Sequence, residues 1–142
     1  MKYLSPHSRK PGTFMYSTGD EGLVIEFEIE YRLGGWGGFD WQNRPRGIYI
    51  DVTPAKLEKR DGYTSRIWTV SVGGSDKISG GWIFLEPLAR LSRKKILQAA
   101  QFFDEFAPVV ANMWLTDTAA AKKLLFEKAT EYQSKFSIQL AA

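Results

Sequence analysis

Residues 22–33 alternate apolar and mostly charged side chains with a period of two, and this pattern constrains the fold more than any other segment. The positions on the apolar side of the alternation are Leu23, Ile25, Phe27, Ile29, Tyr31 and Leu33. Such spacing predicts a β-strand that buries one face against another layer of the protein. The opposite face carries Glu26, Glu28 and Glu30, and we expect it to be solvated, as in an antiparallel sheet covered on one side.

Three more strands are expected after this one, in the order 47–54, 63–72 and 78–85. Pro54 is expected to end the first of them, because proline lacks the N–H that a sheet ladder uses. A charged turn over 56–62 and a hairpin turn over 73–76 then connect the strands.

The first twenty residues are rich in proline, serine, glycine and charge. We interpret residues 1–20 as a flexible N-terminal segment, or as the start of a strand near 14–16. The sequence shows no internal repeat and no interdomain linker, so residues 21–142 are expected to form a single domain.

The hydrophobic period becomes helical after Pro87. Ser92 is a suitable N-cap for a first helix, and Pro108 must end or kink that helix. The apolar side chains at helical spacing in it are Ile96, Leu97, Ala100 and Phe103. A last helix capped by Thr116-Asp117 carries a stripe of Ala121, Leu125, Ala129, Tyr132 and Phe136.

The order of these elements predicts an α+β fold. We expect a four-stranded antiparallel β-meander followed by two or three C-terminal helical segments, which pack on one face of the sheet. A chain of 142 residues is long enough to bury a core of this kind.

The composition excludes several kinds of active site. The chain has no cysteine, which excludes disulfides, thiolate zinc sites and cysteine nucleophiles. Its single histidine, His7, argues against a Ser-His-Asp triad and against a multi-histidine metal site. We therefore expect a non-enzymatic protein with no cofactor and no metal. The sequence shows neither a leader-like apolar region at its start nor a run of eighteen apolar residues, so we expect a cytoplasmic protein and no membrane contact.

A loop over residues 34–46 combines four glycines with aromatic and basic side chains. Its candidate binding residues are Trp36, Phe39, Trp41, Arg44 and Arg46. Aromatic rings between glycines suit stacking on unpaired bases, with the arginines on phosphates. The same rings also suit a groove on a protein partner, where tryptophan and arginine dominate binding. A third interpretation is that the two tryptophans fold back and close the end of the core.

A second basic feature surrounds Ser92, at the expected start of the first helix. Its candidate binding residues are Arg90, Arg93, Lys94 and Lys95. Free amides and cationic side chains at a helix N-terminus form a suitable site for an anion such as a phosphate. The alternative is an ordinary solvated basic face.

The glutamates at 26, 28 and 30 could gather a hard cation or act as an acid and base, with Asp51 across from them. Simple alternation is also what a charged outer sheet face shows, with Arg32, Arg66 or lysines on a neighbouring strand as counter-ions. We favour the structural interpretation.

The run from Arg46 to Pro54, the segment 60–63 and the basic run 91–95 together resemble a group of small proteins carried by phages and plasmids of gut-type bacteria. Those proteins are mostly uncharacterised and have an RGYYLxVTP-like strand, a charged turn, two more strands and a basic entry into a C-terminal helix. The resemblance covers residues 24–107 and implies a mobile-element context. It carries over no catalytic residues.

These features predict a binding protein of a phage or mobile element, which contacts single-stranded DNA or RNA through the glycine–tryptophan loop and the basic helix start. The alternative is an inhibitor or adaptor of the anti-defence type, which binds a host protein through the same loop. The net charge of +3 argues against a mimic of DNA, since that would be strongly acidic. The sequence is also compatible with a homodimer that forms through the sheet or the C-terminal helix.

Overall fold

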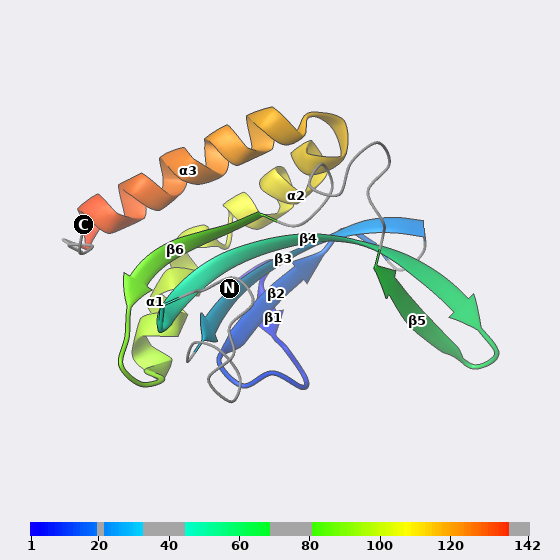
Figure 1. Cartoon of the computed structure of the whole chain (residues 1–142), viewed down its shortest axis with the longest axis horizontal. Helices are drawn as coiled ribbons and strands as arrows, with labels where there is room; N and C mark the ends of the chain where they lie inside the picture. Colours follow the sequence, from blue (N-terminus) through cyan, green and yellow to red (C-terminus); the bar gives the residue numbers. More distant parts are fainter. Residues whose placement is uncertain (20–21, 33–44, 69–80, 137–142) are drawn as a thin grey trace.

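An antiparallel sheet with three helices on one face forms the described part of the chain (Figure 1). The computed structural model describes residues 1–19, 22–32, 45–68 and 81–136. Its strands are β1 (Ser5–Pro6), β2 (Thr13–Ser17), β3 (Gly22–Arg32), β4 (Gly47–Arg60), β5 (Tyr63–Trp68) and β6 (Gly81–Pro87). The α+β class and the antiparallel sheet are confirmed. The expected four strands correspond to β3–β6, to which β2 and the two-residue β1 are added.

Residues 1–19, for which the sequence predicts a flexible segment or the start of a strand, carry β1 and β2. β2 pairs along its whole length with β3, from Thr13↔Glu30 to Ser17↔Glu26. β1 adds two pairs to the free edge of β2. The N-terminal segment is therefore part of the sheet in this structure.

β6 departs from the meander that the order of the strands predicts. It pairs with β4 over Gly47–Val52, while β5 pairs with the other half of β4 over Ala55–Arg60. Both strands share one edge of β4, and the other edge pairs with β3. β4 is 14 residues long, so it has room for two partners on one side.

Pro54 lies inside β4, and the prediction that it ends the strand is wrong. It falls between the last residue paired with β6 and the first residue paired with β5. On the other side it faces Ile25, whose backbone N–H and C=O bond to Thr18 instead. The missing proline N–H therefore removes no bond from either ladder.

The turn between β4 and β5 is shorter than the charged turn that the sequence predicts over 56–62. Residues 56–60 continue β4, and the chain reverses at Asp61-Gly62, where Gly62 has a φ of +79°. Glycine adopts this left-handed conformation without steric cost. The hairpin predicted over 73–76 lies outside the described residues.

The helices are α1 (Arg93–Phe103), α2 (Phe106–Thr116) and α3 (Thr118–Lys135). The Ser92 side chain accepts the N–H of Lys95, and that of Asp117 accepts the N–H of Ala120, so both expected N-caps are confirmed. Pro108 lies in the first turn of α2, where a helix needs no N–H donor.

All three helices cover the same face of the sheet (Figure 1). Their buried side chains include Ile96, Phe103, Val110, Leu125 and Tyr132, which pack on Ile25, Phe27, Ile29, Ile48, Ile50 and Leu85 of the strands. The stripe predicted for the last helix is therefore largely confirmed. Leu97 is an exception among the predicted core positions, since it is 40% exposed.

The carboxylate face of β3 is buried, so the expectation that it is solvated is wrong. Glu26, Glu28 and Glu30 are only 1%, 7% and 4% exposed. β3 lies between β2 and β4 and pairs with both of them. Arg32 donates from Nε to Glu30 Oε1 at 2.7 Å and lies 3.6 Å from Asp51. Lys10 Nζ lies 3.7 Å from Glu28. These ion pairs give Glu28, Glu30 and Asp51 a structural role.

Candidate nucleic-acid interface

The basic residues at the starts of β4 and α1 come together at one end of the sheet. Leu88 donates its N–H to the carbonyl oxygen of Arg46 at 3.3 Å. This bond joins the segment before β4 to the connection between β6 and α1, which contains Arg90. The end of β3, the start of β4 and the end of β6 lie at this end in Figure 1. Two features that are far apart in sequence therefore share one surface.

The turn between β1 and β2 reaches the same end. Tyr31 donates its N–H to the carbonyl oxygen of Gly12 at 3.1 Å. Gly12 has a φ of +74°, and a side chain there would collide with Leu91 and Ile96. Glycine thus lets the turn approach the start of α1 closely. Its basic residues Arg9 and Lys10 are exposed.

Six exposed cations from three chain segments now lie at this end, which we call the basic end. They are Arg9, Lys10, Arg46, Arg90, Arg93 and Lys94. Arg9 and Lys10 are additions that the sequence alone did not suggest, because nothing local in it connects the N-terminal turn with residues 90–94.

Lys95, which the sequence also predicts as a binding residue, makes an ion pair within the protein. Its Nζ lies 3.6 Å from Oε2 of Glu86, whose other oxygen accepts the Tyr132 hydroxyl at 3.0 Å. Glu86 is 4% exposed. Burial and the charge of Glu86 raise the pKa of Tyr132, so its hydroxyl stays a donor. Lys95 therefore helps to join α1, β6 and α3.

Arg32 also belongs to the structure of the sheet. Burial lowers the pKa of its guanidinium, but the hydrogen bond and charge of Glu30 and the charges of Asp51 and Glu28 raise it, and the net pKa lies above its ordinary value. Arg32 is therefore a permanent counter-ion of the carboxylate face.

The start of α1 keeps two free donors. The Ser92 hydroxyl accepts from the N–H of Lys95 at 3.3 Å, and the Ser92 carbonyl accepts from Ile96 at 3.1 Å. Within the part of the chain that the structure describes, the N–H groups of Arg93 and Lys94 have no acceptor. Such groups at a helix N-terminus attract anions.

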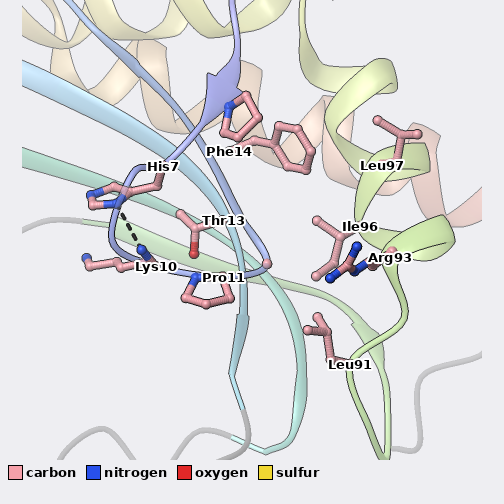
Figure 2. A pocket seen from close by; sticks show the side chains of 11 residues that line it. His7, Lys10, Pro11, Thr13, Phe14, Leu91, Arg93, Ile96 and Leu97 are labelled. Carbon is pink, nitrogen blue, oxygen red and sulfur yellow. Dashed lines mark hydrogen bonds between the residues drawn. The ribbon is translucent and has the colours of Figure 1, made fainter.

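A cavity of about 350 Å³ lies between the β1–β2 turn and the start of α1, and we call it the turn–helix pocket. Phe14, Leu91, Ile96 and Leu97 lie on its helix side, with Arg93 beside them (Figure 2). The turn closes the other side with His7, Lys10, Pro11 and Thr13.

His7 shapes the turn that closes this pocket. Its Nδ1 accepts the N–H groups of Arg9 at 2.9 Å and Lys10 at 3.1 Å, and Figure 2 draws the second of these bonds. Nδ1 therefore carries no proton, and the proton of the neutral ring is on Nε2.

We expect His7→Ala to destabilise the protein by about 1 kcal/mol, because both N–H groups of the turn lose their acceptor. His7→Asn is the matched control, since an asparagine side-chain oxygen can accept the same N–H groups in an Asx-turn. Urea unfolding of the three proteins measures the difference. Equal losses for alanine and asparagine would show that the acceptor at this position does not stabilise the turn.

Of the other predicted binding residues, Trp36, Phe39, Trp41 and Arg44 lie outside the described residues. Arg46, Arg90, Arg93 and Lys94 are exposed at the basic end.

Comparisons of this chain with protein-family models, with curated proteins and with solved structures find no match. No helix among the described residues is long and apolar enough to cross a membrane.

Proposed function

We propose that this chain is a non-enzymatic binding protein that holds single-stranded DNA or RNA across the basic end. The observation that carries the proposal is the meeting of six exposed cations from the β1–β2 turn, the start of β4 and the start of α1. Cations gathered on one surface neutralise phosphates and release counter-ions, which is the main source of affinity for a nucleic-acid strand.

The charges around the basic end support this proposal. The nearby carboxylates Glu30 and Glu86 are buried and paired with Arg32 and Lys95, so they add little negative field at the surface. A phosphate chain that approaches this end therefore meets mainly exposed arginine and lysine side chains. The phage or plasmid context that the sequence resemblance implies is part of the same proposal, as is a cytoplasmic location.

The test measures the binding of a fluorescent oligothymidine by anisotropy at rising salt. For the double variant Arg90→Gln/Lys94→Gln, we expect weaker binding and a log–log salt slope that is shallower by about 1.4, because each phosphate contact to a single strand contributes about 0.7.

Lys56→Gln/Lys123→Gln is the matched control, since it removes the same charge from exposed positions on β4 and α3. We expect this variant to keep the wild-type slope. No binding by the wild type at low salt, or the same loss in both double variants, would contradict a strand held at the basic end.

The alternative proposal is an inhibitor or adaptor that binds a host protein with Trp36, Phe39 and Trp41 as its anchors. These residues lie outside the described part of the chain, so the geometry above does not favour it. Failure of the wild type to bind oligonucleotides at low salt would move the preference to this alternative.

A further inference from the structure

We propose that the turn–helix pocket binds one terminal nucleotide of the strand, through the phosphomonoester at the strand end. This inference rests on the proposed function, because it names the part of the ligand that the basic end recognises. It adds a preference for phosphorylated ends to a surface that otherwise recognises only the negative charge of the strand.

The volume of the pocket suits a single nucleotide. A volume of about 350 Å³ lies at the small end of the range of about 300–1,000 Å³ that small-molecule sites span. The turn closes the pocket on the side away from α1 (Figure 2). A strand that enters such a pocket is expected to place one nucleotide there rather than pass through it.

The start of α1 provides the donors for a phosphate. Arg93 lines the pocket, and it makes no ion pair with any described residue. The free N–H groups of Arg93 and Lys94 lie at the same helix end, where the dipole favours negative charge. A terminal phosphate carries about 1.5 to 2 negative charges near neutral pH, and the phosphate inside a strand carries one. The helix start therefore favours the terminal group.

Thr13 adds a hydroxyl group to the wall of the pocket. It lines the pocket and is only 5% exposed, yet its hydroxyl has no hydrogen-bond partner among the described residues. Figure 2 shows this hydroxyl inside the β1–β2 turn, toward Pro11 and the backbone of Lys10. Its oxygen is not among the fully buried atoms that lack a partner, so it is open to solvent and can donate to a sugar or phosphate oxygen bound in the pocket.

The apolar side of the pocket suits the rest of the nucleotide. Phe14, Leu91 and Leu97 line it together with Pro11, and Leu91 and Leu97 are each 40% exposed. A base or sugar that covers these side chains removes apolar surface from water. The pocket thus combines cationic donors with an apolar wall, as a nucleotide requires.

The experiment compares oligothymidines of one length that carry a 5′-phosphate, a 3′-phosphate or no terminal phosphate, with anisotropy as the readout. We expect the wild type to bind one phosphorylated end about ten-fold more tightly than the unphosphorylated strand. Arg93→Gln is expected to bring this ratio close to one. Thr13→Val, which keeps the shape of the side chain, is expected to reduce it. Thymidine monophosphate, titrated alone and followed by amide NMR, is expected to shift the signals of Arg93 and Lys94.

The double variant Arg90→Gln/Lys94→Gln distinguishes the pocket from the basic end as a whole. It is expected to weaken binding of all three strands while the ratio between them stays at the wild-type value. A wild-type ratio near one, or an unchanged ratio in Arg93→Gln, would overturn the pocket proposal and leave strand binding intact. If no strand binds at low salt, the proposed function fails, and shifts with the monophosphate alone would still support the pocket.

Discussion

Replacing Asp104 with alanine is expected to lower the free energy of unfolding by about 3 kcal/mol, because three N–H groups lose a charged acceptor. Asp104 follows α1 and is 7% exposed. Its Oδ1 accepts the N–H groups of Tyr3 at 3.0 Å and Leu4 at 2.8 Å, and its Oδ2 accepts that of Lys2 at 2.8 Å. One carboxylate therefore ties the N-terminal segment to the helical layer.

The same carboxylate makes stability depend on pH. Burial raises the pKa of Asp104, but the N–H groups of Leu4, Lys2 and Tyr3 lower it, and the net pKa lies below the ordinary value of 3.8. A carboxyl with a lowered pKa stabilises the folded state above its unfolded pKa, and this contribution disappears as the pH falls through the folded pKa. The difference between wild type and Asp104→Ala should therefore be constant from neutral pH to about 5 and shrink below about 4.

Urea unfolding at several pH values between 3 and 7 measures this difference. Asp61→Asn is the control, because Asp61 is exposed in the turn between β4 and β5. We expect this variant to unfold like the wild type at each pH. If Asp104→Ala lost no more stability than Asp61→Asn, the N-terminal segment would not depend on the carboxylate.

The loss of this contact also has a consequence for the turn–helix pocket. β1 follows directly after the tethered residues and leads into the turn that closes the pocket. A detached N-terminal segment would leave that turn held mainly by β2. We therefore expect the phosphate-end preference of Asp104→Ala to fall even under conditions in which the protein stays folded.

Much of the fold could be predicted because its signals are local. The alternation over 22–33 identifies β3, and it assigns Ile25, Phe27 and Ile29 to the core side, where they are buried. The two N-caps could be predicted in the same way, since a serine or aspartate before a helical stripe bonds to amides within three residues.

The burial of Glu26, Glu28 and Glu30 could not be predicted in this way. A period of two shows that a strand has two faces, but it does not show what lies over each of them. These three residues lie on a strand that has β2 on one side and β4 on the other, and Glu28 and Glu30 have Lys10 and Arg32 as counter-ions. The pairing of β6 with β4 likewise joins segments that are far apart in sequence, so local patterns do not predict it.

The candidate site was predictable only in part. The basic start of α1 could be predicted from the run of Arg and Lys around an N-cap, and Arg93 and Lys94 are exposed there. The pocket depends on a contact between residues 7–14 and 91–97, which no local pattern indicates. Gly12 permits that contact, but the sequence alone does not distinguish it from the other glycines of the chain.

Replacing Gly47 with alanine is expected to destabilise the protein by about 3 kcal/mol or more, because the added methyl group has no space. A Cβ at this position would overlap the carbonyl oxygen of Glu86 and the ring of Phe84. The ring could move, but the carbonyl belongs to the backbone of β6, so the first pairs between β4 and β6 would have to separate. Gly19→Ala is the matched control, since a methyl group there meets only Val24 at 4.0 Å, and we expect it to be neutral.

Gly47→Ala is also expected to change the structure of the basic end, because Gly47 follows Arg46 and pairs with Pro87. A shift of β6 would disturb the bond from Leu88 to Arg46 and the contacts of Glu86 with Lys95 and Tyr132. Chemical unfolding tests the stability, and oligonucleotide anisotropy at low temperature tests binding by the protein that still folds. We expect Gly47→Ala to bind more weakly than Gly19→Ala. Wild-type stability with unchanged binding would show that β4 and β6 can separate here without effect, and that the two basic segments do not need this junction to act together.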